Sequence, residues 1–265
     1  YAYGRTLLCD SGIFTYDNSD PYRQWGLSSV AHNTVVINDT SQRRNWGPGT
    51  EDFMNPLGKG VIHDWVTNRT YDFLSQSTYA TEGYDHQRSI TFVKPHFWIV
   101  SDRMIPEEEN ASKVNNYKQI WHMMPDSGIT ADGQTGIIRS NYSDGANIIL
   151  ASVDQADSQY LLEDGWFDKS MNMLEPSKYA YVEKEGAGEV TFDTVIVPYQ
   201  DDPNASVQQE KLDTGVDSNV ATALHFTSNI NNVTTDTYYY LSYEEDPSAS
   251  RTFCLLYTSD AADEL

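Results

Sequence analysis

Short runs of strand length recur along the whole chain, and this pattern constrains the fold more than any other feature. Typical runs are NTVVIN, RSITFVKPHFWIVSDRM and EVTFDTVIVPY, which are rich in β-branched and aromatic residues. Turn-forming segments such as GPGTED, ADGQTG and QDDPNAS separate the runs. We predict a hairpin tip at Asp132-Gly133. We also predict a link between two strands at Pro95, because proline cannot donate to a central ladder.

Helical periodicity is almost absent from the sequence. Only SVQQEKLD, at residues 206–213, suggests one or two helical turns. Many short strands with so little helix are typical of all-β folds, so we predict a large antiparallel β-sandwich. It would occupy residues 1–253 as one domain, with a smaller and loosely attached C-terminal sheet from about residue 200.

The two ends of the chain look unlike the ends of a natural protein. The opening segment, YAYGRTLLCDSG, contains no Met and no signal peptide. Residues 254–265 contain CLLYTSDAADE, which reads like the translation of a sequencing adapter. We therefore expect native sequence to stop near Phe253, in an incomplete metagenomic reading frame. Without the last residues only Cys9 remains, so the cysteine count predicts nothing about the redox compartment.

Charge and hydropathy exclude two classes of partner. The formal net charge is −22, and it remains −19 without the three acids of residues 254–264. Such a charge argues against nucleic acid or an anionic membrane as the main partner, and a polyanionic sugar would need a local basic groove. No segment approaches the roughly 18–20 apolar residues that span a bilayer, so no membrane span is predicted.

Two of the six histidines, His32 and His86, lie in polar segments. His32 is in SSVAHNTVVIN, directly before a β-branched run, and His86 is in EGYDHQRS. The acidic segment GPGTEDF lies between them. Two imidazoles and a carboxylate are a common ligand set for zinc with an open position. We predict a zinc site at His32, His86 and Asp52, with Glu51 and Asp64 as alternative carboxylates; another divalent cation would suit the same ligands.

The segment LLCDSGIFTYDNSDPYRQWGLSSVAHNTVVINDTSQ resembles the start of the β-sandwich domain of heparinase II/III-like polysaccharide lyases. Two further segments, YDHQRSITFVKPHFWIVSDRM and QIWHMMP, are similar to later blocks of the same family. The resemblance extends from about residue 5 to residue 200. Its first block contains Asp10, Gly12, Tyr16, Arg23, Ser28, Ser29, Ala31 to Val35, and Gln42.

The resemblance implies a lyase with two parts. An N-terminal α/α toroid, missing from this chain, carries a catalytic tyrosine and an asparagine or histidine. The sandwich contributes a histidine to the cleft and commonly a metal site. The implied substrate is a uronate-containing glycan, glycosaminoglycan-like or alginate-like, that is cleaved by β-elimination. The implied location is the bacterial periplasm or the exterior, and we expect the isolated chain to be inactive.

β-Elimination explains the residue types that the resemblance singles out. A base removes the C5 proton, an acid protonates the departing O4, and a donor or cation neutralises the substrate carboxylate. His32 matches the family histidine and is predicted to be catalytic or a metal ligand. Arg23 and Arg88 are predicted to pair with the substrate carboxylate, because a guanidinium binds it bidentately. The predicted substrate-binding residues are Asn33, Trp25 and Tyr84.

Other functions stay open. In a non-catalytic carbohydrate-binding or structural sandwich, His32 and His86 would be ordinary hydrogen-bonded residues, Arg88 would pair with an acid, and Trp25 would pack in a core. A cupin-type metal enzyme is disfavoured because the sequence has no HxH spacing. The separation of the His32 and His86 rings discriminates these readings, since rings within about 4 Å beside a carboxylate would fit a zinc site.

Overall fold

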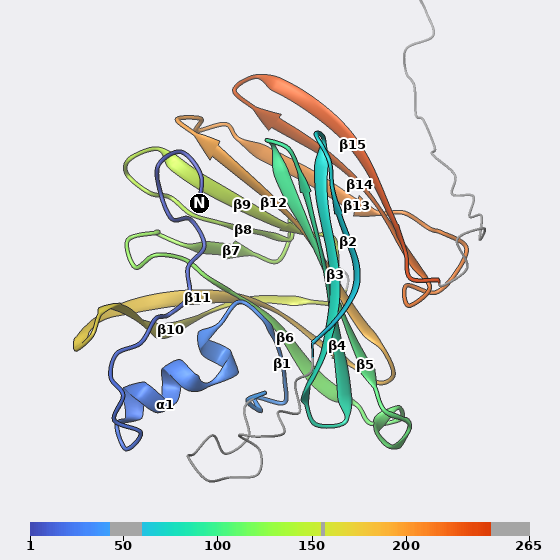
Figure 1. The fold of residues 1–265 in the computed structure, drawn as a ribbon. Helices are drawn as coiled ribbons and strands as arrows, with labels where there is room; N and C mark the ends of the chain where they lie inside the picture. Colours follow the sequence, from blue (N-terminus) through green and yellow to red (C-terminus); the bar gives the residue numbers. More distant parts are fainter. Residues whose placement is uncertain (43–59, 155–156, 245–265) are drawn as a thin grey trace, which may run out of the picture.

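The computed structural model describes residues 1–42, 60–154 and 157–244 as three antiparallel sheets with little helix (Figure 1). The sheet orders are β2-β3-β4-β5-β12-β9-β8-β7, β1-β6-β11-β10 and β13-β14-β15. The predicted all-β sandwich is therefore confirmed. Its elements are helix α1 (Pro21–Leu27), 3-10 turns at Ser29–Ala31 and Glu108–Asn110, and strands β1 (Val35–Ile37), β2 (Val61–Thr67), β3 (Tyr71–Thr81), β4 (Tyr84–Val93), β5 (Phe97–Pro106), β6 (Asn115–His122), β7 (Thr130–Asp132), β8 (Ile137–Arg139), β9 (Ala146–Ser152), β10 (Gln159–Ser170), β11 (Met173–Gly186), β12 (Val190–Gln200), β13 (Ser206–Lys211), β14 (Ala221–Ile230) and β15 (Val233–Ser242).

The eight-stranded sheet is the middle of three layers. Every residue of β9 is buried, and every residue of β12 except its last. Strands covered on both faces have no side that water can reach, which is why β9 and β12 contain the short apolar runs IILA and VIVPY. These two strands carry the cores on either side of the sheet.

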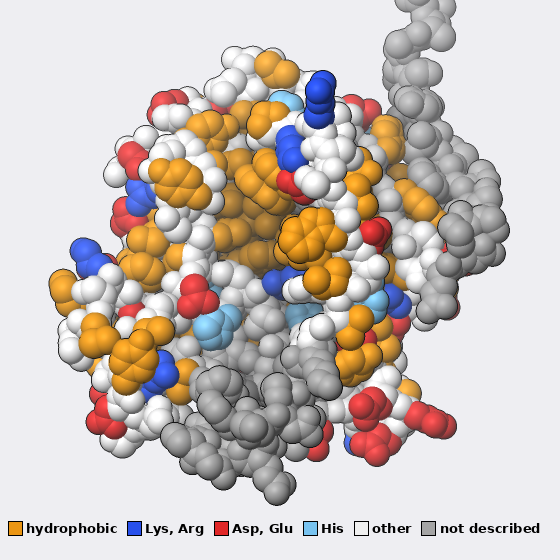
Figure 2. All heavy atoms as spheres, viewed as in Figure 1, with side chains coloured by type: hydrophobic (Ala, Val, Ile, Leu, Met, Phe, Trp, Pro, Cys, Tyr) orange, Lys and Arg blue, Asp and Glu red, His pale blue; other side chains and the backbone are white. Residues whose placement is uncertain are grey.

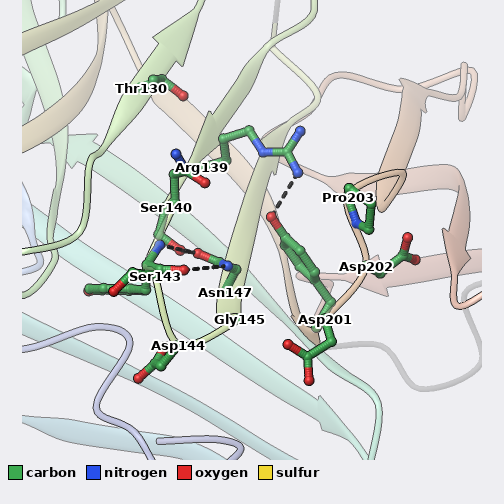
Figure 3. Close-up of a pocket in the computed structure, with 13 residues that line it drawn as sticks. Thr130, Arg139, Ser140, Ser143, Asp144, Gly145, Asn147, Asp201, Asp202 and Pro203 are labelled. Atoms are coloured by element: carbon green, nitrogen blue, oxygen red, sulfur yellow. Dashed lines mark hydrogen bonds between the residues drawn. The ribbon is translucent and has the colours of Figure 1, made fainter.

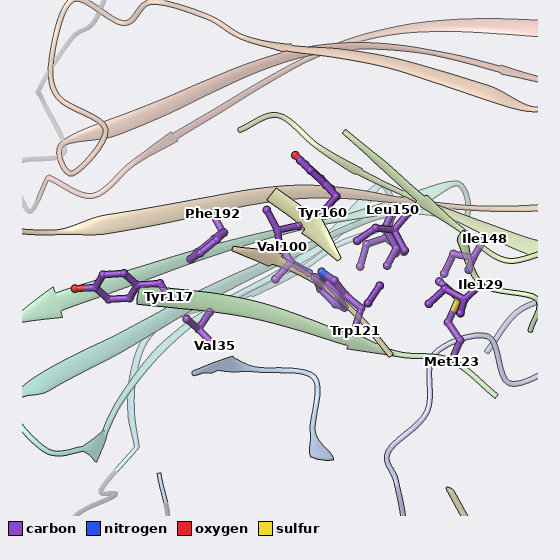
Figure 4. Close-up of a cluster of buried hydrophobic side chains, with 14 of the residues drawn as sticks. Val35, Val100, Tyr117, Trp121, Met123, Ile129, Ile148, Leu150, Tyr160 and Phe192 are labelled. Atoms are coloured by element: carbon purple, nitrogen blue, oxygen red, sulfur yellow. The ribbon is translucent and has the colours of Figure 1, made fainter. Parts of the chain in front are cut away.

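The first core lies between the four-stranded and eight-stranded sheets (Figure 4). It anchors β1, whose three residues are all buried. Val35 and Ile37 point into this core, and Val36 packs on the opposite face with Ile120. The strand that follows His32 is therefore held from both sides. Facing side chains in this core include Val35, Tyr117 and Trp121 from one sheet and Val100, Leu150 and Phe192 from the other.

The second core joins the three-stranded sheet to the other face of the eight-stranded sheet. Leu224 and Phe226 of β14 are fully buried there with Val195 of β12. Lys211 of β13 adds an ionic contact, with its Nζ 3.2 Å from Asp193. The described residues after β12 thus form the three-stranded sheet β13-β14-β15, which shares this core with the eight-stranded sheet.

The structure confirms two predicted turns and contradicts the predicted helical turn. The hairpin tip follows Asp132 between β7 and β8, and the Pro95 segment links β4 to β5. The expected helical turn at SVQQEK is wrong, because this segment pairs with β14 as strand β13 and buries Val207 in the second core. Helix α1 was not expected, although Asp20-Pro21 is a capping signal: the Asp20 side chain accepts from Tyr22 N at 2.8 Å.

An apolar hollow of about 310 Å³ opens on the inner face of the eight-stranded sheet beside the N-terminal segment. Ile90, Trp98, Val100 and Ile196 are among the side chains that line it, and Tyr1 stands at its edge. Figure 2 shows a hollow floored by hydrophobic side chains near the middle of this view. No helix in the described ranges is long and apolar enough to cross a membrane.

Candidate functional site

His32 lies at the mouth of β1, where helix α1 and the following 3-10 turn end. The His32 N–H donates to the Ser29 carbonyl, and the extended backbone at His32 leads into the strand. Its side chain is 39% exposed, with Nδ1 2.6 Å from Asp10 Oδ2. The other Asp10 oxygen accepts from the Gly12 N–H at 3.1 Å, in a turn where Gly12 has φ +88°. The turn therefore aims the Asp10 carboxylate at the imidazole.

The Asp10–His32 contact changes the pKa of both groups. The hydrogen bond to Asp10 raises the pKa of His32 above its ordinary value, and it outweighs partial burial, which lowers it. Burial raises the pKa of Asp10, but the hydrogen bonds from His32 and Gly12 outweigh burial, so the net shift is downward. His32 therefore keeps its proton to a higher pH than a free histidine does.

Asn33 fixes the backbone beside His32. Its Nδ2 donates to the Cys9 carbonyl at 2.7 Å, and its Oδ1 accepts from the His122 N–H at 2.7 Å. The side chain thus joins the N-terminal segment to β6. The side chain of Asn33, predicted to bind substrate, therefore makes structural hydrogen bonds. The backbone carbonyl of Asn33 accepts from Arg88 Nη1 at 2.6 Å.

His86 belongs to a buried ionic network rather than to the surface beside His32. Its Nε2 lies 2.6 Å from Asp102 Oδ1, and Asp102 is completely buried. Arg88 donates from Nε and Nη2 to the two Asp102 oxygens at 2.7 and 2.8 Å, and Gln119 donates to Oδ2 at 2.8 Å. Burial alone would raise the pKa of Asp102, but Arg88 and His86 outweigh it and lower that pKa far below its ordinary value. Through Arg88 this network supports the Asn33 backbone next to His32.

Residues 1–210 match the sequence model of the family described as heparinase II/III-like, C-terminal. The chain belongs to this family. It is 24% identical over 215 residues to a heparin-sulfate lyase of Pedobacter heparinus. The aligned region covers 78% of this chain and 30% of the lyase. The crystal structure of heparan sulfate lyase HepC from Pedobacter heparinus superposes with a TM-score of 0.73 at 21% identity, covering 91% of this chain and 36% of HepC. A crystal structure of heparinase III gives a TM-score of 0.69 at 16% identity, covering 90% of this chain and 34% of that one. The chain thus spans about a third of the length of these relatives.

The other predicted site residues take different places in this heparinase II/III-like domain. Arg23 on α1 lies over the Tyr16 ring at 5.5 Å, and within the described part of the chain it has no carboxylate at salt-bridge distance. Trp25 is half-buried against His122, with ring centroids 6.2 Å apart. Tyr84 is only 7% exposed and its hydroxyl accepts from Asn115, so as placed it offers little surface to a ligand. Of the two arginines, Arg23 is the one free to meet an anion.

The residues that the structure describes do not by themselves fit a zinc ion. Each predicted imidazole has its own carboxylate, Asp10 for His32 and Asp102 for His86, and both contacts measure 2.6 Å. No cluster of three or more His, Cys, Asp or Glu side chains within 1–42, 60–154 and 157–244 is placed to hold a metal. Asp52 and Glu51 lie outside the described residues, and Asp64 is exposed on β2. The zinc site stays a prediction, which metal analysis of the purified chain would test.

Two residues that support the site, Asp10 and Asp102, were not predicted as site residues from the sequence. Asp10 was named only within the block that resembles the lyase family, and its contact with His32 was not predicted. Asp102 is a lone acid inside the strand FWIVSDRMIP, and such an acid needs a buried cation. His122 donates from Nε2 to the Val30 carbonyl at 2.8 Å and stacks on Tyr179. Burial lowers the pKa of His122 to about 4, so this ring is neutral and structural.

Proposed function

We propose that this domain is the sandwich portion of a polysaccharide lyase that cleaves uronate-containing glycans by β-elimination. The observation that carries the proposal is the Asp10–His32 pair, which is partly exposed at the mouth of an anchored strand in a heparinase II/III-like domain. The likeness to a heparin-sulfate lyase supports a glycosaminoglycan-like substrate, with an alginate-like polymer as the alternative. A polymeric substrate of this kind supports location in the periplasm or outside the cell, which fractionation of the source organism would test.

His32 suits the proton-donating half of the reaction. In β-elimination the C5–H bond breaks, its electron pair forms the C4–C5 double bond, the C4–O bond breaks, and a proton goes to the departing O4. Because Asp10 raises the pKa of His32, the imidazole keeps its proton to a higher pH than an ordinary histidine does, and the protonated ring can donate to O4 or to the substrate carboxylate. Arg23, which has no described carboxylate partner, would neutralise the substrate carboxylate from α1. The base that removes the C5 proton would then come from the rest of the protein.

The isolated chain is expected to be inactive, whereas the longer protein should form unsaturated uronate. The test is to recover the upstream reading frame, express both proteins, and follow ultraviolet absorbance with heparan sulfate and with alginate as substrates. Activity of the isolated chain would contradict the two-part proposal. Glycan binding by the longer protein without any unsaturated product would instead support the non-catalytic carbohydrate-binding alternative.

We also propose that an α/α toroid preceding this domain packs on the apolar hollow. The matched family model is a C-terminal one, and the chain spans about a third of its relatives. The apolar surface continues from the hollow to the sheet edge, because the register pairs Trp65 with Leu74 and Leu74 with Ile90 on one face. Trp65 is 68% exposed. An exposed apolar surface of this kind is typical of an interface.

Footprinting of side chains by hydroxyl radicals tests this packing. We expect oxidation of Trp65 and Tyr1 to fall several-fold in the longer protein compared with the isolated chain, because a covered side chain is shielded from solvent. Tyr238 of β15 is 38% exposed on the outer sheet and serves as the control, with unchanged oxidation expected. Equal oxidation of Trp65 in both proteins would rule out this docking surface.

A further inference from the structure

A second pocket, polar and larger than the apolar hollow, lies at the end of strands β8, β9 and β12 (Figure 3). Its volume is about 770 Å³, and its walls are the turn at residues 141–145 and the turn that follows β12. A volume between about 300 and 1,000 Å³ is usual for small-molecule sites. None of the residues that line this pocket belongs to the His32 or His86 contacts.

The walls of this pocket are held in place before any ligand arrives. Asn147 Oδ1 accepts from Ser140 Oγ at 2.8 Å and from the Tyr142 N–H at 2.7 Å, which pins the first turn to β9. The Asp201 N–H donates to the Gly145 carbonyl at 3.0 Å, which joins the two turns. Gly145 has φ +84°, a conformation that other residues rarely adopt, and a Cβ there would displace the Asp201 carboxylate, so this turn favours glycine. A preformed pocket loses little entropy when it binds.

Several polar groups of the lining make few or no hydrogen bonds with the residues that the structure describes. Arg139 donates from Nη2 to the Tyr199 hydroxyl at 2.7 Å, the dashed bond at Arg139 in Figure 3, and in the described ranges it has no carboxylate at salt-bridge distance. Thr130, Asn141 and Ser143 are exposed, and their side chains make no hydrogen bond with the described residues. The pocket therefore offers unused donors and acceptors on a rigid frame.

The charges of the lining indicate what kind of ligand it suits. Asp144 is paired with Arg5, and the Asp202 oxygens accept from the backbone N–H groups of Asn204 and Asn231. This leaves the Arg139 guanidinium and the Asp201 carboxylate, which Figure 3 places at opposite ends. An anionic ligand would be attracted by Arg139 but repelled by the three aspartates of the lining, Asp144, Asp201 and Asp202. Hydroxyl groups can accept from Arg139 and donate to Asp201 at once.

We propose that this pocket binds an uncharged sugar unit through its hydroxyl groups, at a site separate from His32. The proposal does not depend on lyase activity, since it rests on the pocket alone. In a protein that acts on a polysaccharide, this pocket would hold the polysaccharide while another part of it leaves and rebinds the site at His32. Binding at the second site is then intramolecular.

The test uses this chain, labelled with ¹⁵N, and N-acetylglucosamine as the probe. We expect saturable shifts of the amide signals of residues 141–145 and 201, with a Kd of about 1–10 mM, the usual range for a few neutral hydrogen bonds. Asn141→Ala and Asp201→Asn should each raise the Kd by about 3-fold to 10-fold. Asn18→Ala, an exposed asparagine outside the pocket, is the matched control and should leave the Kd unchanged.

Each other outcome overturns the proposal. One is the absence of saturable shifts at about 100 mM sugar, far above the expected Kd. A second is binding that Asn141→Ala and Asp201→Asn leave intact, which would place the sugar elsewhere. A third is tighter binding of glucuronate than of the neutral sugar, which would show that Arg139 selects an anion. Well-dispersed amide signals of each variant establish that it is folded.

Discussion

Asp102→Asn is expected to lower the free energy of unfolding by about 3–5 kcal/mol, the usual cost of breaking a buried ion pair. The substitution keeps the shape of the side chain but leaves Arg88 as a buried cation with only neutral partners. His86 and Gln119 lose their charged acceptor in the same step. Urea denaturation of both proteins at neutral pH measures the difference.

Two comparisons separate the ionic effect from a general loss of packing. The double variant Arg88→Met/Asp102→Leu removes both charges, and it should recover much of the stability because no unpaired ion remains. Glu175→Ala breaks the exposed pair with Lys169 and should cost less than about 1 kcal/mol. A cost of that size for Asp102→Asn would show that the buried network contributes little.

The stability contributed by Asp102 should also depend on pH. Its folded-state pKa is lowered, so this stability is fully present above the ordinary carboxyl pKa of about 3.9 and is lost as the pH falls through the folded value. The difference between the natural chain and Asp102→Asn should therefore shrink in acid below about pH 4. A difference that grows in acid would contradict this assignment.

His32→Ala in the longer protein is expected to reduce turnover by about 10²–10⁴-fold, the usual contribution of a general acid or base. Asp10→Asn should cause a smaller loss and should also move the pH profile. Because Asp10 raises the pKa of His32, its removal lowers that pKa. If His32 donates a proton, activity falls as the pH rises through its pKa, so the alkaline limb should move to lower pH.

The measurement is kcat between about pH 5 and pH 9, which brackets the ordinary histidine pKa. Asp17→Asn is the control, since this neighbouring carboxylate binds Ser19 and no imidazole. A shift of the acidic limb instead of the alkaline limb would make His32 the base. Full activity of His32→Ala would remove it from the reaction altogether.

Local pattern was sufficient to predict the sandwich and the position of His32. The run EVTFDTVIVPY has strand length and is rich in β-branched and aromatic residues, and it forms β12. The β-branched run after Asn33 places His32 at the mouth of a strand whatever lies on the other side. Strand runs and the place of His32 before one of them depend on residues adjacent in the sequence, so they can be predicted from the sequence alone.

Only the tertiary structure decided what each functional side chain contacts. Asp10 and His32 are 22 residues apart and meet where the turn at Gly12 lies beside the start of β1, whereas His86 and Asp102 are 16 apart and meet through the pairing of β4 with β5. The register of β4 and β5 places Arg88 opposite Asp102 in the buried network, whereas Arg23 lies on helix α1 without a described carboxylate. Which side chains meet across a sheet depends on which strands pair and on their register. The alternation of apolar residues shows which face of a strand is buried, but it does not determine which strand lies next to it.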